Sequence, residues 1–376
     1  MKFRVERDVL AEGVTWAARA LPTRPSIPTL SGLLLSTESA KSNDVVLSGF
    51  DMETAARIQI DANVDEPGRV LVSGRLLADI SRSLPAQPVV ISTEGSRVRV
   101  ECGRSSFELP TLPVDEYPIL PEMPDPVGTV GGAEFAAAVA QVAIAAGRDD
   151  TLPMLLGIRI EINDDTVTMA ATDRYRLAVR EFTWKPEKAS FESTALVPAR
   201  TLAETAKLLA GAGSVSVAYS TGGAGDGLMG FEGDGRRTTT RLLDGEFPKY
   251  RQLLPDDSSA VATIETAALV EAVKRVALVA ERNTPVRLIF SADEIALQAG
   301  SGDEAQATES VECSLSGDPI EIAFNPQYLL DGLGAVDSPE VDLSFTGPTR
   351  PAVLTRSGGS NTQEYKYLLM PVRLSS

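Results

Sequence analysis

The chain has 376 residues, 43% of them hydrophobic, and its 52 acidic and 35 basic side chains give a formal net charge of −17. This length fits two or three domains with packed cores, and no apolar run reaches the ~20 residues that a membrane span needs. Histidine is absent and the only cysteines are Cys102 and Cys313, which excludes histidine-dependent nucleophiles, a disulfide framework and a thiolate zinc site.

The N-terminal segment, Met1 to Asp8, carries charges where a signal peptide would need apolar residues, so we expect a cytoplasmic protein. The first predicted helix follows. Apolar residues between Leu10 and Leu21 recur at i, i+3, i+4, i+7 and i+11, which is the pattern of a helix with one buried face. The same spacing returns between Phe135 and Ala146, and again between Leu269 and Ala280.

A second set of elements repeats in the same order. Beyond each helix comes an apolar run suited to a strand, at 32–35, 157–160 and 286–290. Further runs typical of strands occupy equivalent places at 45–51, 167–173 and 295–301. Second amphipathic helices are predicted within 72–79, 197–204 and 324–331. The repeat predicts three similar α+β domains, each with two helices on a strand-rich sheet, at 1–127, 128–256 and 257–376.

Basic residues recur on or just after the predicted helices, although the chain as a whole is acidic. Arg75 and Arg82 in the first copy match Arg200 and Lys207 in the second. This distribution fits one surface that faces phosphate while the rest repels it. The alternative is that these side chains cover exposed helix faces and pair with nearby acids.

Several collinear motifs resemble the bacterial sliding clamp family, the DNA polymerase III beta subunits. They are the charged start of the chain, Thr-Asp-x-x-Arg-Leu at 172–177, Asp-Gly-Glu-Phe-Pro-Lys-Tyr at 244–250 and Met-Pro-x-Arg-Leu at 370–374. The resemblance implies the clamp fold, with two subunits joined head to tail into a six-domain ring around duplex DNA. It also implies a processivity factor without catalytic residues, cofactor or metal.

The resemblance further assigns residues to sites. Sequence-independent DNA contacts fall on Arg24, Arg75, Arg82, Arg148, Arg200 and Lys207. Short peptides of the replicative polymerase, the clamp loader and repair polymerases would bind a pocket formed by Leu155, Thr172, Arg174, Tyr175, Arg176, Leu177, Pro248, Leu253, Thr349, Pro351, Leu368, Met370, Pro371, Val372 and Arg373. The homodimer interface falls on Arg104, Phe107, Leu109, Ala277, Leu278, Asp303 and Glu304. Leu155, Leu177, Pro248 and Leu278 could equally be ordinary core residues.

The sequence departs from the pattern of the family at the pocket. Arg174 and Tyr175 stand where Gly and His are frequent, and Gln252 and Val372 replace commoner Arg and Met, which predicts a bulkier wall. Two other classes of function remain open from the residues alone. One is a repeat-containing interaction protein that binds no DNA, and the other is a hydrolase that uses carboxylates. Within the family, a paralogue with other partners is also open.

Overall fold

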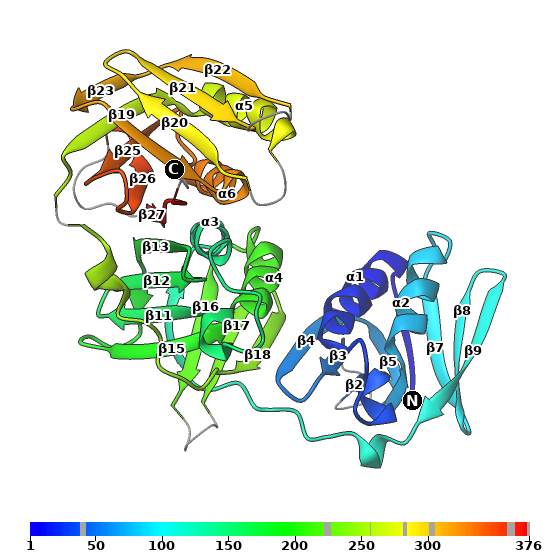
Figure 1. The fold of residues 1–376 in the computed structure, drawn as a ribbon. Helices are drawn as coiled ribbons and strands as arrows, with labels where there is room; N and C mark the ends of the chain where they lie inside the picture. The colour runs from blue at the N-terminus through cyan, green and yellow to red at the C-terminus, as the bar shows by residue number, and fades with distance from the viewer. Residues whose placement is uncertain are drawn as a thin grey trace. The chain divides into compact units, whose positions relative to one another are not determined.

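The computed structural model describes residues 1–37, 43–221, 227–255, 257–280, 284–300, 305–358 and 365–373. They form two compact units, Met1–Ala133 with Leu208–Leu242, and Glu134–Lys207 with Leu243–Ser376. Figure 1 labels the helices and most of the strands of both units.

The six predicted helices are confirmed. They are α1 (Arg7–Ala17), α2 (Gly74–Ser83), α3 (Gly132–Ala143), α4 (Ala199–Leu209), α5 (Thr266–Val276) and α6 (Pro326–Val336). In α1, Leu10, Val14 and Ala17 are buried, as the apolar spacing predicted, because these positions share one face of the helix. Short 3₁₀ helices extend α1 and α5, at Ala18–Ala20 and Ala277–Val279.

The strands of the first unit pair antiparallel in the spatial order β10-β16-β17-β18-β4-β3-β2-β6-β9-β8-β7-β1-β5. Their bounds are β1 (Lys2–Val5), β2 (Gly32–Thr37), β3 (Asp44–Phe50), β4 (Thr54–Asp61), β5 (Asn63–Glu66), β6 (Gly68–Ser73), β7 (Val89–Glu94), β8 (Arg97–Cys102), β9 (Ser105–Leu112), β10 (Pro126–Val130), β16 (Val215–Ser220), β17 (Leu228–Gly233) and β18 (Arg236–Arg241). Helices α1 and α2 pack against each other, and α1 also packs on β3 and β4 (Figure 1).

The second unit contains a sheet of order β15-β11-β12-β13-β27-β26-β25-β19-β23 and a smaller one of order β22-β21-β20-β24. The bounds are β11 (Gly157–Asn163), β12 (Thr166–Thr172), β13 (Arg176–Thr183), β14 (Lys185–Pro186), β15 (Glu192–Pro198), β19 (Ala260–Glu265), β20 (Val286–Phe290), β21 (Glu294–Ala299), β22 (Ala307–Glu312), β23 (Ser314–Gly317), β24 (Ile320–Phe324), β25 (Glu340–Phe345), β26 (Ala352–Arg356) and β27 (Tyr365–Leu369). Helix α5 packs on α6 and on β21 and β22.

One strand pairing of the second unit prepares the site. In β13 and β27, Leu177 lies opposite Leu368, and Leu368 lies opposite Val353 of β26. All three side chains are buried and belong to one apolar cluster with Phe247 and Tyr250. Segments from two of the predicted domains therefore share one sheet and one core.

Candidate functional site

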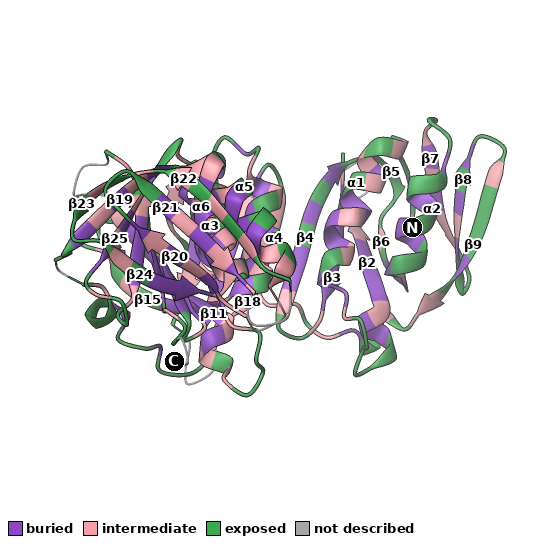
Figure 2. Ribbon diagram, turned by 45° about the horizontal axis from the view of Figure 1, so that its top comes forward, coloured by how far each residue is buried: buried purple, intermediate pink, exposed green. Residues whose placement is uncertain are grey.

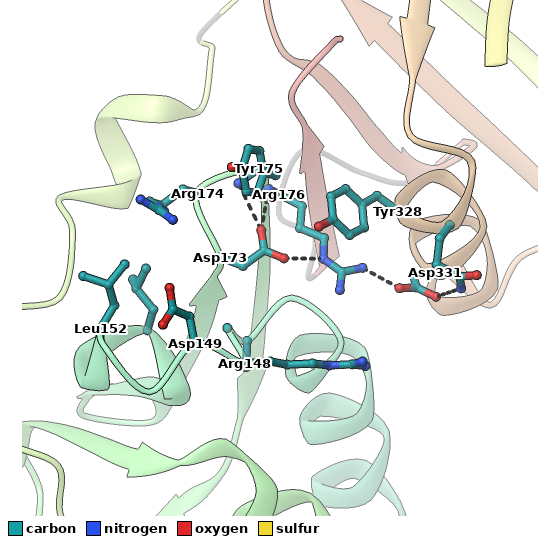
Figure 3. Close-up of a pocket in the computed structure, with 13 residues that line it drawn as sticks. Arg148, Asp149, Leu152, Asp173, Arg174, Tyr175, Arg176, Tyr328 and Asp331 are labelled. Carbon is teal, nitrogen blue, oxygen red and sulfur yellow. Dashed lines mark hydrogen bonds and ion pairs between the residues drawn. The ribbon is translucent and has the colours of Figure 1, made fainter. Parts of the chain in front are cut away.

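A cavity of about 750 Å³ opens in the second unit (Figure 3). Three segments surround it, namely the chain after α3, the turn between β12 and β13, and the first half of α6. Its lining consists of Ala146, Gly147, Arg148, Asp149, Leu152, Leu155, Asp173, Arg174, Tyr175, Arg176, Gln327, Tyr328 and Asp331. The cavity thus contains four of the predicted pocket residues.

The turn between β12 and β13 is held by its own polar side chains. The Asp173 carboxylate accepts hydrogen bonds from the backbone N–H groups of Tyr175 (3.0 Å) and Arg176 (3.1 Å). The Thr172 hydroxyl donates to the Arg176 carbonyl at 2.7 Å and accepts from the Arg174 N–H at 3.2 Å. Local bonds of this kind fix a tight turn. The turn presents Arg174 and Tyr175 to solvent, and Tyr175 is 55% exposed.

Arg176 points inward from the same turn and is 5% exposed. Its guanidinium bonds Asp173 at 3.0 Å and Asp331 of α6 at 2.5 Å, and lies 4.4 Å from the centre of the Tyr328 ring (Figure 3). Burial alone would lower the pKa of Arg176, but Tyr367 and the two carboxylates raise it above its ordinary value. The buried cation therefore ties the turn to α6.

The residues that α6 contributes to the cavity are not among those predicted from the sequence. Asn325 caps the helix by accepting from the backbone N–H groups of Gln327 and Tyr328, and Pro326 occupies the first turn. This start places Tyr328 against Tyr175, with ring centres 6.2 Å apart. The cap and the proline were readable signals of a helix start. No sequence signal showed that this end of α6 would meet the 172–176 turn.

Large apolar side chains of the second unit are exposed at Tyr175 of the cavity lining, at Leu253 (51% exposed), at Met370 (40%) and at Val372 (38%). The backbone N–H of Met370 donates to the Tyr175 carbonyl at 2.9 Å, and that of Val372 donates to the Ala323 carbonyl at 2.8 Å. Clusters of large exposed apolar side chains are typical of binding surfaces. We call these four residues the apolar rim.

The remaining predicted pocket residues differ in burial. Leu155, Leu177 and Leu368 are buried, so the core alternative agrees with the burial of Leu155 and Leu177. Pro248 is exposed, and the core alternative does not hold for it. Thr349 and Arg373 are exposed, while Pro351 and Pro371 are half-buried.

A carboxylate positions the segment that carries Leu253. Glu161 of β11 accepts hydrogen bonds from Arg159 (2.6 Å), the Tyr250 hydroxyl (2.9 Å) and Arg251. Desolvation raises the pKa of Glu161, but these three donors outweigh it and leave the pKa below its ordinary value. The ionised carboxylate therefore anchors the short 3₁₀ helix Tyr250–Leu253 to the sheet.

The predicted DNA-contacting residues are all exposed, but their partners differ. Arg82 pairs with Asp79 at 2.5 Å and Arg200 with Glu204 at 3.1 Å, as the alternative of helix-surface ion pairs expected. Arg75 donates to the Pro22 carbonyl. In the part of the chain that the structure describes, Arg24, Arg148 and Lys207 have no carboxylate partner.

Two of the predicted dimer residues are exposed, Phe107 on strand β9 and Leu278 on the 3₁₀ helix Ala277–Val279. Strand β9 pairs with β6 only through Thr111 and Leu112, so its earlier residues have β8 on one side alone, and much of β9 is exposed (Figure 2). Strand β22 is an edge of the smaller sheet. Leu278 is 83% exposed and Phe107 is 37% exposed, which excludes the core alternative for Leu278.

Other predicted dimer residues are placed less simply. Arg104 is exposed and Ala277 is half-buried, whereas Leu109 is 1% exposed within its own unit. Asp303 and Glu304 lie outside the described residues.

Among the described residues, neither a metal site nor a membrane-spanning helix is present. No group of three or more Cys, Asp or Glu side chains is arranged to hold a metal ion. None of the described helices has the length and hydropathy to cross a membrane.

Comparison with known proteins decides the family. Models of the DNA polymerase III beta subunit match in sequence order: the N-terminal domain at residues 1–121, the central domain at 129–249 and the C-terminal domain at 251–373. The chain belongs to the DNA polymerase III beta subunit family. It is thus a sliding clamp by family, a processivity factor of DNA polymerase that acts in DNA replication and is not an enzyme.

Individual clamps agree over the full length. The beta sliding clamp of Streptomyces coelicolor is 61% identical, with 100% of each chain covered. The beta sliding clamp homolog GriR of Streptomyces muensis is 45% identical, with 99% of each covered. A solved sliding clamp from Pseudomonas aeruginosa, bound to griselimycin, is 27% identical, with a TM-score of 0.90 and 100% of each chain covered. The predicted three-domain clamp fold is thereby confirmed.

Proposed function

We propose that this clamp captures partner proteins by binding short peptides in the cavity and along the apolar rim. The observation that supports this is the rim itself, because Tyr175, Leu253, Met370 and Val372 are 38–55% exposed, Tyr175 lines the cavity and Met370 is hydrogen-bonded to Tyr175. Soft and aromatic side chains of this kind accommodate several related peptides. The replicative polymerase, the clamp loader and repair polymerases are the proposed partners, and the cytoplasm is the proposed location.

We further propose that two copies join head to tail through the edges of β9 and β22. Each edge strand has unpaired backbone groups on one side, and pairing them between copies would satisfy those groups. Phe107 and Leu278 would form the apolar centre of the contact. The domain boundaries proposed for each copy are 1–127, 128–256 and 257–376.

The basic residues Arg24, Arg75, Arg82, Arg148, Arg200 and Lys207 would contact the duplex inside such a ring. Retention of a closed ring is topological, so these contacts can be few and independent of base sequence. Because the ion pairs of Arg82 and Arg200 are exposed, they are weak enough to exchange for phosphate.

The decisive experiment measures retention on closed-circular DNA at high salt, after loading by a clamp loader. Retention that is lost when a nuclease linearises the circle would establish encirclement. Equal retention on both forms would contradict it and would indicate ordinary electrostatic binding. Fluorescence anisotropy with a labelled partner peptide tests peptide binding separately. The proposals of DNA encirclement and of peptide binding can therefore be refuted independently.

A further inference from the structure

The lining of the cavity contains three arginines and three aspartates, so its formal charges cancel, but the arginines are not equally paired. Of its three arginines, Arg176 is neutralised by Asp173 and Asp331. Among the described residues, the guanidinium groups of Arg148 and Arg174 form no ion pair, and Asp149 is the one other acid in the lining. The lining therefore contains two arginines without an ion pair, and their side chains extend in different directions (Figure 3).

The remaining acid is already engaged. Asp149 accepts hydrogen bonds from the backbone N–H of Thr151 (3.0 Å) and from its hydroxyl (2.6 Å). The side-chain and backbone bonds from Thr151 lower the pKa of Asp149, and the charge of Arg174 contributes less. Because Asp149 is turned toward Thr151, Arg174 keeps donor capacity for a ligand.

Arg174 occupies a backbone position that disfavours its side chain. Its φ is 80°, in the left-handed region where a Cβ is sterically unfavourable and glycine is the default residue. The strained residue stands at the mouth of the cavity, where its guanidinium lies 6.0 Å from the centre of the Tyr175 ring (Figure 3). Strain retained at a binding site is a reason to look for a role of the side chain.

The surroundings of Arg174 define the ligand. Leu152 and Leu155 line the cavity together with the stacked rings of Tyr175 and Tyr328, so an apolar side chain fits beside this cation. We infer that Arg174 is a specificity-determining residue that binds a carboxylate of the partner peptide next to its apolar anchor. This inference rests on the proposed peptide-binding function.

The test compares matched peptides on the full-length protein. One peptide carries Asp beside its apolar anchor and has an amidated C-terminus, a second has Asn there, and a third has Asn and a free C-terminal carboxylate. Asp and Asn are exchanged at each position next to the anchor. We expect the wild type to bind the Asp peptide about threefold to tenfold more tightly than the Asn peptide, as for a partly exposed charge-assisted pair. Preference for the third peptide instead would assign the subsite to a chain terminus and overturn the side-chain assignment.

The variants separate charge from backbone strain. Arg174→Gln keeps the Cβ but removes the charge, and Arg174→Gly also removes the strain. Both should bring the Asp-to-Asn affinity ratio close to one, and Arg174→Gly should also raise the melting temperature. Lys188→Gln, an exposed cation of the second unit outside the cavity lining, removes the same charge and should leave the ratio unchanged.

Two results would overturn the inference in different ways. If the Asp and Asn peptides bind the wild type equally, or if Arg174→Gln still prefers the Asp peptide, the carboxylate subsite is absent. The proposed peptide-binding site would be unaffected by either result. If no peptide binds the wild type, the proposed peptide site fails as well. Higher ionic strength should reduce the preference, since it screens a partly exposed pair.

Discussion

The buried cation Arg176 should couple the 172–176 turn to α6 energetically, and a double-mutant cycle with Asp331 measures this coupling. The two groups meet at 2.5 Å, and the Arg176 side chain is 5% exposed, so solvent screens the pair weakly. Arg176→Met should lower the free energy of unfolding by about 3 kcal/mol, at the lower end for a broken buried pair, because the two carboxylates left behind partly reach water. Asp331→Asn should lower the free energy of unfolding by about 1–2 kcal/mol.

The double variant should then cost less than the two single losses together, by about 1–2 kcal/mol. The assay is urea unfolding followed by the fluorescence of Trp184, which is buried in the second unit and donates its indole N–H to the Asp164 carbonyl at 2.8 Å. A Trp16→Phe background removes the other tryptophan, which belongs to the first unit.

A matched control tests whether burial of the ion pair causes the predicted loss of stability in Arg176→Met. Arg200 also pairs with a carboxylate, at 3.1 Å, but is 90% exposed. Arg200→Met should therefore change the free energy of unfolding by less than about 0.5 kcal/mol. Additive losses in the Arg176 and Asp331 cycle, to within about 0.3 kcal/mol, would refute the coupling.

Four further predictions address the interface, the rim, the packing and the pH dependence. Leu278→Asp should convert a dimer into folded monomers in analytical ultracentrifugation, and an intact dimer would rule out the proposed edge. Deleting 370–376 should abolish peptide binding in anisotropy while circular dichroism is unchanged, because β27 ends before this segment; retained affinity would refute the rim. Gly332→Ala should cost about 2 kcal/mol or more, since the added Cβ would lie 2.4 Å from the Tyr367 ring, and an unchanged urea midpoint would contradict this. Since folding lowers the pKa of Glu161, its stabilisation is present above the unfolded value near 4.5 and is lost as pH falls through the folded pKa. Urea unfolding at pH 6 and pH 3.5 should show this loss in the wild type and less of it in Glu161→Gln; equal losses would count against it.

Leu278 shows a limit of what the apolar spacing of a helix can predict about burial. Leu278 follows the buried stripe of α5 by two residues, and from sequence it could be core or interface. The stripe reports which face of a helix is apolar, but not where the helix ends its contact with the sheet. The structure decided the question, because the chain continues past Val276 as a 3₁₀ turn that leaves Leu278 in water.

The sequence by itself determined the repeated elements and the family, because periodicity and collinear motifs are local along the chain. The six helices and the strand β11 with its alternating isoleucines follow from such patterns. Only the tertiary structure decided that Arg176 would be buried against Asp331 and Tyr328. These residues are far apart in sequence, and they meet because β13 and α6 pack in one unit. Likewise, the free charge of Arg174 became visible only once the lining of the cavity showed which acids are already paired.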